Sequence, residues 1–118
     1  LPSTSSTRHI IGAEALAALP KGASLINPGR GSLIDEAALL DALGEGTQEG
    51  RLRGAILDAF PEEPLPATSP LWTHPRIWIT PHMAGPTPLG EAVDQVVAAI
   101  RAFEAGDMIE YVDRDAGY

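Results

Sequence analysis

Three polar residues, Arg30, Glu63 and His82, each follow a short apolar run of the kind that forms a buried strand. If these runs form a parallel sheet, their carboxyl ends meet at one edge, where open α/β sheets bind ligands. Arginine grips a carboxylate with two hydrogen bonds, and imidazole titrates near neutrality. The set suits reduction of a 2-keto acid. Arg30 would anchor and polarise the substrate, Glu63 would hold the ring of His82, and His82 would protonate the carbonyl oxygen while a cofactor supplies hydride.

Each residue of this set also has an ordinary structural interpretation. His82 could simply cap its strand and bond to backbone, and Arg30 could be a surface arginine. Glu63 could be an exposed loop carboxylate, and Asp58, near the end of the second run, could be only a hydrogen-bond acceptor. Residue types and spacing leave these alternatives open.

Other chemistries find less support in the sequence. The chain has no cysteine and its three histidines show no metal-ligand spacing, so we predict no metal site. We expect His9 and His74 to lie on the surface without a specific role. The sequence contains neither the Gly-x-Ser-x-Gly motif of serine hydrolases nor a Gly-x-Gly-x-x-Gly dinucleotide fingerprint.

Composition restricts the class of protein and of partner. The 118 residues are 44% hydrophobic and 20% charged, which indicates a globular chain of at most one domain. A net charge of −8 argues against nucleic acid and against anionic membrane as partners. No apolar run approaches the roughly 20 residues that span a bilayer, and the N-terminus lacks the features of a signal peptide. We therefore expect a cytoplasmic protein.

The pattern of apolar residues predicts strands that alternate with helices, which is typical of a parallel sheet with crossover helices. Asp35 is a predicted N-cap, Pro81 should end the last strand, and Gly106 should end the last helix. Gly29 and Gly31 should permit a tight turn and a close approach of the backbone to a ligand. We expect strands at 23–27, 54–60 and 76–80, helices at 13–19, 36–43 and 88–105, and a single helical turn at 69–72.

Three strands make only part of a sheet, and the chain begins with Leu1 rather than methionine. The sequence therefore predicts a fragment of a larger protein. Intact mass would test this, because a two-domain protein with about 150 residues in each domain has a mass of roughly 35 kDa, against 12.4 kDa for this chain.

Four spaced motifs, which cover nearly the whole chain, resemble the D-isomer-specific 2-hydroxyacid dehydrogenases. They are Leu-Pro-Ser-Thr at 1–4, Ile-Asn-Pro-Gly-Arg-Gly at 26–31, Gly-Ala-Ile-Leu-Asp-Ala-Phe at 54–60 and Thr-Pro-His-Met-Ala at 80–84. Within the family, the segment 69–75 and the ending 112–118 resemble the glyoxylate/hydroxypyruvate reductase A branch.

The resemblance implies an α/β fold in which residues 1–118 are the C-terminal half of a Rossmann-like NAD(P)-binding domain. The tail after the long helix would return to a substrate domain. By the same resemblance Arg30 binds the substrate, His82 is the general acid/base and Glu63 is its carboxylate partner. The residues implied at the cofactor are Pro2, Thr4, Asn27, Pro28, Gly29, Arg30, Asp58, His82 and Gly85.

The resemblance further implies a small 2-keto acid substrate, a homodimer formed through the cofactor domain, and NADP or NAD as cofactor, with NADPH slightly favoured. We expect no turnover by the isolated 118-residue chain, because it lacks the phosphate-binding loop. The alternative is that the short chain is a natural product that acts as a non-catalytic binding or dimerisation module.

Overall fold

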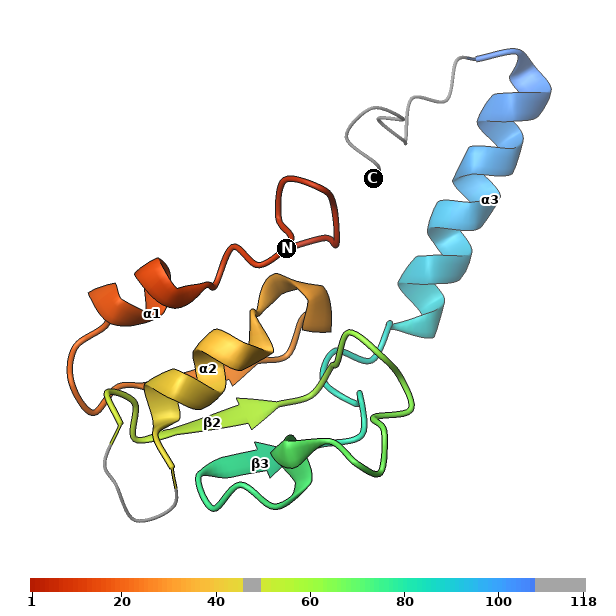
Figure 1. Cartoon of the computed structure of the whole chain (residues 1–118). Helices are drawn as coiled ribbons and strands as arrows, with labels where there is room; N and C mark the ends of the chain where they lie inside the picture. Colours follow the sequence, from red (N-terminus) through yellow and green to blue (C-terminus); the bar gives the residue numbers. More distant parts are fainter. Residues whose placement is uncertain (46–49, 108–118) are drawn as a thin grey trace. The chain divides into compact units, whose positions relative to one another are not determined.

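A computed structural model of the chain describes residues 1–45 and 50–107. The chain divides into two units, residues 1–84 and residues 85–118 (Figure 1). Residues 46–49 and most of the expected tail after the long helix, residues 108–118, therefore lie outside the described residues.

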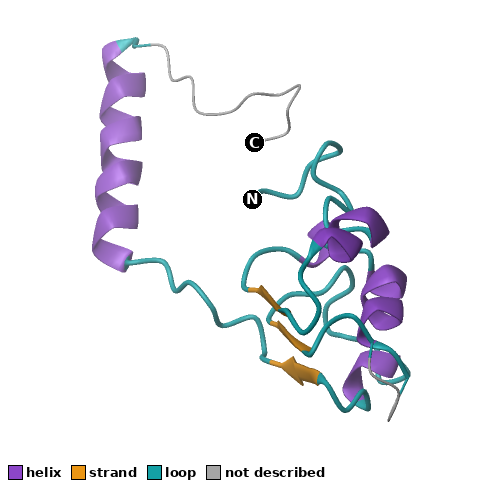
Figure 2. Cartoon of the chain, turned by 90° about the vertical axis from the view of Figure 1, so that its left-hand side faces the viewer, coloured by secondary structure: helices purple, strands orange, loops and turns teal. Residues whose placement is uncertain are grey.

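The first unit is built on three parallel strands, β1 (Ser24–Asn27), β2 (Gly54–Leu57) and β3 (Ile77–Ile79), in that spatial order. Both strand pairs are parallel, as the alternating pattern predicts, and Figure 2 shows the strands side by side. Because the strands are parallel and in order, the loops that follow them all leave the same edge of the sheet.

Two helices, α1 (Ala13–Ala18) and α2 (Glu36–Leu43), cover one face of this sheet (Figures 1 and 2). The side chain of Asp35 caps α2 as predicted, since its Oδ1 accepts a 3.1 Å hydrogen bond from the Ala38 amide. The buried core between helices and sheet is almost wholly leucine and alanine. It contains Leu16, Ile34, Leu39, Leu43, Leu52, Ala55, Leu57 and Leu71.

The opposite face of the sheet carries Ile26, Ile56 and Trp78, which are direct neighbours across the three strands. All three side chains are exposed among the described residues. Strand residues therefore alternate between the core and this apolar row, with the two-residue period of a pleated sheet.

The second strand is shorter than the run 54–60 from which it was predicted. Its pairing with β1 ends at Leu57. The amide of Phe60 donates instead to the carboxylate of Glu63, so this residue has left the ladder and entered a turn. The prediction was correct for the core of the strand and wrong for its last three residues.

His74 is not the surface residue without a specific role that the sequence predicts. It is half-buried, its Nε2 lies 3.0 Å from the carbonyl oxygen of Gly44, and its Nδ1 accepts from the Arg76 amide. The guanidinium of Arg76 donates to the Leu43 carbonyl at 2.8 Å. These side chains satisfy carbonyls at the end of α2, which have no partner within the helix. His9 is exposed, as expected.

The second unit contains α3 (Leu89–Ala105), which ends at Gly106 in the left-handed conformation that glycine tolerates best. Its bounds agree with the predicted helix 88–105. Within the helix the apolar residues Val93, Val96, Val97, Ile100 and Phe103 recur at three- and four-residue spacing. In the part of the chain that the structure describes, no helix is long and apolar enough to cross a membrane.

Candidate active site

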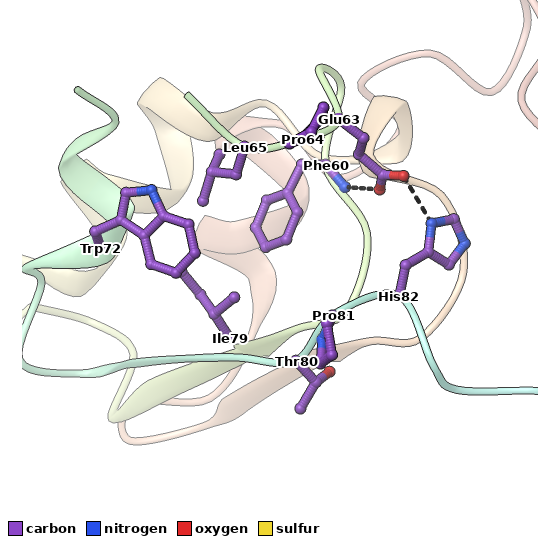
Figure 3. Close-up of a pocket in the computed structure, with 9 residues that line it drawn as sticks. All are labelled: Phe60, Glu63, Pro64, Leu65, Trp72, Ile79, Thr80, Pro81 and His82. Carbon is purple, nitrogen blue, oxygen red and sulfur yellow. Dashed lines mark hydrogen bonds and ion pairs between the residues drawn. The ribbon is translucent and has the colours of Figure 1, made fainter. Parts of the chain in front are cut away.

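The centre of the candidate site is a hydrogen bond between the side chains of Glu63 and His82, on the loops that follow β2 and β3. The Oε2 atom of Glu63 lies 2.8 Å from Nδ1 of His82, and Oε1 accepts a 2.8 Å hydrogen bond from the Phe60 amide. Figure 3 shows the carboxylate between these two nitrogen atoms. Since a carboxylate only accepts, Nδ1 carries the hydrogen, and Nε2 on the other side of the ring is left for a ligand.

The backbone at His82 is held in an uncommon conformation. Its φ angle is 50°, in the left-handed region that side chains other than glycine and asparagine rarely adopt. The His82 amide donates to the Thr80 carbonyl at 3.0 Å, which closes a tight turn directly after the strand. Such conformations are sustained by their surroundings and are frequent at functional sites.

The Phe60 amide, followed by the His82 side chain, lowers the pKa of Glu63 below its ordinary value of 4.5, and the charge of Arg30 contributes last. Glu63 is therefore a carboxylate at neutral pH. Because the pKa is lower in the folded chain than in the unfolded one, this group stabilises the fold fully above about pH 4.5. The contribution is lost as the pH falls through the lowered value.

We expect Glu63→Gln to remove this part of the pH dependence. The free energy of unfolding, measured by urea titration between about pH 7 and pH 3, should fall less steeply in the variant than in the unsubstituted protein. Glu62→Gln is the control, because it removes one carboxylate from an exposed position in the same loop. Equal slopes for Glu63→Gln and the unsubstituted protein would contradict the expectation.

Arg30 lies at the same edge of the sheet, after β1, with its side chain exposed. Its Nη1 donates to the Gly29 carbonyl at 3.1 Å, and its charge helps to lower the pKa of Glu63. The structure thus brings Glu63 and His82 into direct contact and places Arg30 nearby without a bond to either. A guanidinium and an imidazole nitrogen exposed at one edge can bind a small acid between them.

Gly31 allows the Arg30 loop to pack directly on the loop that carries Glu63. A Cβ atom on Gly31 would lie 1.9 Å from the carbonyl carbon of Phe60 and 2.3 Å from the nitrogen of Pro61. The close approach at Gly31 is to the protein's own chain, and the predicted approach of this backbone to a ligand stays a prediction. At Gly29 the nearest atom would lie at 3.4 Å, an ordinary contact.

We expect Gly31→Ala to destabilise the protein by about 3 kcal/mol or more, because both backbones must move to admit a methyl group. Gly29→Ala is the matched control on the other side of Arg30 and should change the free energy of unfolding by less than about 1 kcal/mol. Thermal or urea unfolding of the two variants measures the difference. Equal stabilities would contradict this account of Gly31.

The predicted cofactor residues at the start of the chain lie in a loop rich in hydroxyl groups. Thr7 Oγ1 donates to the Pro2 carbonyl at 2.7 Å, and the Thr4 amide donates to Thr7 Oγ1 at 2.9 Å. The hydroxyls of Ser3 and Ser32 lie 2.7 Å apart, which joins this loop to the turn after Arg30. Pro2 and Thr4 are thus near the edge of the sheet at which the predicted site lies.

The remaining predicted residues divide into three groups. Pro28 and Gly29 lie beside Arg30, where Pro28 is exposed and Gly29 is half-buried. Asn27 and Asp58 are buried at the ends of β1 and β2. The carboxyl of Asp58 has a lowered pKa, chiefly because the Thr80 hydroxyl and then the Met83 amide donate to it. Gly85 begins the second unit, so its predicted place at the cofactor stays a prediction.

An apolar hollow of about 600 Å³ lies beside the Glu63–His82 pair. Trp72 forms part of the aromatic wall of this hollow, which the sequence did not predict. The residue belongs to a one-turn helix, and the local pattern does not specify the direction of such a helix. The indole nitrogen of Trp72 donates to the Pro66 carbonyl at 3.0 Å and holds the ring in place. The lining residues are Phe60, Glu63, Pro64, Leu65, Trp72, Ile79, Thr80, Pro81 and His82 (Figure 3).

The side chains at the carboxyl edge of the sheet fit the reactive end of a nicotinamide cofactor better than they fit a metal ion. Exposed side chains of Arg30 and His82 and a hydroxyl-rich loop share the carboxyl edge of a parallel sheet, where dinucleotides bind in such folds. The glycine-rich motif that binds a pyrophosphate is not in this sequence. Within residues 1–45 and 50–107 no three potential ligand side chains gather around a possible metal position.

Residues 1–84 match the family model for the NAD binding domain of D-isomer specific 2-hydroxyacid dehydrogenases. Glyoxylate/hydroxypyruvate reductase A of Salmonella paratyphi B is 46% identical over the whole chain, which spans 37% of that protein. The chain thus spans little more than a third of the length of the curated relatives it matches.

Solved structures give the same match. One is a D-isomer specific 2-hydroxyacid dehydrogenase from Xanthobacter autotrophicus Py2 in complex with NADPH and MES. It is 44% identical to this chain with a TM-score of 0.87, and the match covers 100% of this chain and 48% of that one. Another is an NADPH-dependent glyoxylate/hydroxypyruvate reductase from Sinorhizobium meliloti in complex with NADP and sulfate. It is 37% identical to this chain with a TM-score of 0.83, and the match covers 100% of this chain and 38% of that one.

Proposed function

The chain belongs to the D-isomer specific 2-hydroxyacid dehydrogenase family, and from this premise we propose that the intact protein reduces a small 2-keto acid to the D-2-hydroxy acid. Glyoxylate and hydroxypyruvate are the proposed substrates, and NADPH or NADH is the reductant. The observation that carries the proposal is the contact of Glu63 with His82 at the edge of the sheet where Arg30 is exposed. The reductase relatives at 46% and 37% identity support the choice of substrate.

The proposed roles follow from the chemistry of the three side chains. Arg30 binds the substrate carboxylate with two parallel hydrogen bonds from its planar guanidinium and polarises the adjacent carbonyl. Glu63 fixes the imidazole through Nδ1, so that Nε2 of His82 can donate a proton to the carbonyl oxygen. When bound, the nicotinamide cofactor supplies the hydride to the carbonyl carbon. In the reverse direction His82 accepts the hydroxyl proton.

The cofactor is proposed to lie along the carboxyl edge of the sheet. Pro2 and Thr4 would contact it from the N-terminal loop, the turn from Asn27 to Arg30 and Asp58 from the strand ends, and His82 and Gly85 from the last loop. The turn from Asn27 to Arg30, Asp58 and His82 come at or after the ends of successive parallel strands, which supports this, because that edge binds dinucleotides in related folds. The contact between the Ser3 and Ser32 hydroxyls supports a place for the N-terminal loop at the same edge. The choice of NADPH over NADH follows the relatives named above.

The test is a spectrophotometric assay of the intact protein with NADPH or NADH, using glyoxylate, hydroxypyruvate and pyruvate as substrates. We expect turnover with the first two and formation of the D-isomer from hydroxypyruvate, identified by chiral chromatography. Absence of cofactor oxidation with every 2-keto acid would overturn the proposal.

We propose that the isolated 118-residue chain gives no turnover, because the sequence lacks the loop that would bind the pyrophosphate. The same assay on the isolated chain tests this, and steady oxidation of NADPH would contradict it. The family resemblance also supports a cytoplasmic homodimer formed through the cofactor domain. Sedimentation of the intact protein would distinguish a dimer from a monomer.

A further inference from the structure

Among the residues that the structure describes, the buried polar or charged side chains are Asn27 and Asp58, at 8% and 3% exposure. They occupy equivalent places, since Asn27 ends β1 and Asp58 directly follows β2. The Asp58 amide donates to the Asn27 carbonyl at 3.1 Å, which places the two residues side by side. Buried polar groups are costly unless they are bonded, so their partners indicate what they do.

The carboxylate of Asp58 is bonded to the loop that carries His82. Oδ1 accepts from the Thr80 hydroxyl and, at 3.0 Å, from the Met83 amide. Oδ2 accepts from the Ala84 amide at 2.8 Å. The three donors flank His82 on both sides, and His82 has a positive φ that is uncommon for a residue other than glycine. Charge-assisted bonds of this kind are about twice as strong as neutral ones.

The carboxamide of Asn27 has the same relation to the loop that carries Arg30. Its Nδ2 donates to the Arg30 carbonyl at 3.0 Å, and its Oδ1 accepts from the Gly29 amide at 3.2 Å. The two bonds use the amide's donor and its acceptor at once, so neither an acid nor an apolar side chain of the same size can replace them. The turn from Asn27 to Arg30 is therefore closed by one side chain.

We propose that Asn27 and Asp58 are positioning residues, each of which holds one loop and thereby one of the two side chains that act on the substrate. Asp58 fixes the backbone around His82, and Asn27 fixes the backbone at Arg30. The bond between their own main chains sets the two loops relative to each other. This inference rests on the proposed function, and it adds a positioning role to the cofactor contacts proposed above for the two residues.

Asp58→Asn in the intact protein tests the first half. The isosteric amide must point an NH₂ group at one of three donors, so the His82 loop loses at least one bond. We expect kcat for glyoxylate to fall by about 10- to 100-fold, as for a misplacement of roughly 1 Å, and by a larger factor than any rise in the Kd for NADPH. A rise in that Kd of tenfold or more, with kcat unchanged, would overturn the positioning role.

Asn27→Asp tests the second half, because a second oxygen would then face the Arg30 carbonyl. Here we expect the KM for glyoxylate to rise about tenfold or more, with smaller changes in kcat and in the Kd for NADPH. A purely structural defect would lower the active fraction and leave KM alone. Equal losses of kcat in both variants with no change in either KM would therefore overturn the proposal.

Amide hydrogen exchange gives a readout that does not depend on activity. In Asp58→Asn we expect the Met83 and Ala84 amides to exchange at least about tenfold faster, while the Ala55 amide within the sheet keeps its protection. Unchanged exchange at Met83 and Ala84 would overturn the proposal even if the reductase activity proved wrong.

If Asp58→Asn does not fold, Thr80→Val is the second variant, because it removes a single donor to the Asp58 carboxylate. We expect it to lower kcat for glyoxylate about threefold. An unchanged kcat would overturn the proposal.

Discussion

His82→Asn in the intact protein is expected to lower kcat for glyoxylate reduction by about 1,000-fold, within the range attributed to general acid–base groups. The variant removes the ring that Glu63 holds through Nδ1, and with it the nitrogen proposed to protonate the substrate. Asparagine is chosen because it tolerates the φ of 50° found at this position. Steady-state kinetics with NADPH and glyoxylate measure the effect.

The matched control is His9→Asn. His9 is also a histidine with a positive φ, of 53°, and its side chain is exposed. Substitution there reproduces any backbone effect without touching the Glu63–His82 pair, and kcat should stay within about threefold of the unsubstituted value. If His82→Asn retains more than about a tenth of the original kcat, His82 is not the general acid.

Arg30→Lys is expected to lower kcat/KM for glyoxylate by about 100-fold or more, chiefly through a higher KM. Lysine keeps the positive charge but loses the planar fork that gives two parallel hydrogen bonds to a carboxylate. Truncating one partner of a bonded charge pair costs about 2–5 kcal/mol, which corresponds to this range. The Kd for NADPH, measured by fluorescence, should change little, because the predicted loss is at the substrate.

Arg53→Lys provides the control for this substitution. The guanidinium of Arg53 donates to the Ser24 hydroxyl at 3.2 Å, at the amino end of the strands and therefore at the opposite edge of the sheet. We expect its kcat/KM to be close to that of the unsubstituted protein. Equal losses in Arg30→Lys and Arg53→Lys would mean that the effect is one of net charge and that Arg30 does not bind the carboxylate.

Much of the first unit could be predicted from local sequence. The helix 36–43 agrees residue for residue with α2, because Asp35 is a strong N-cap and the apolar residues follow one face. Strand boundaries were less accurate. The run 54–60 is apolar except for Asp58, but the Phe60 amide donates to the side chain of Glu63 and does not continue the ladder. A contact between a loop side chain and a strand backbone is not visible in hydrophobic periodicity.

The assignment of His74 to the surface failed for a related reason. Its bond to the Gly44 carbonyl joins residues 30 positions apart, and no local pattern encodes such a pairing. Similarly, the need for glycine at position 31 arises from the backbone of Phe60, in the loop that follows β2. The sequence predicted a close approach to a ligand at this glycine and did not predict the protein segment that packs against it.

The sequence by itself predicted which residues could bear the chemistry, and it determined which edge of the sheet they share. Strand order in a parallel αβ chain follows from short right-handed connections, so Arg30, Glu63 and His82 had to leave the same edge. Only the tertiary structure decided how they are held. The pairing of Oε2 with Nδ1, the burial of Asp58 beneath the His82 loop and the closure of the Arg30 turn by Asn27 depend on distances between separate loops. Those distances follow from packing of the whole unit, which no single stretch of residues specifies.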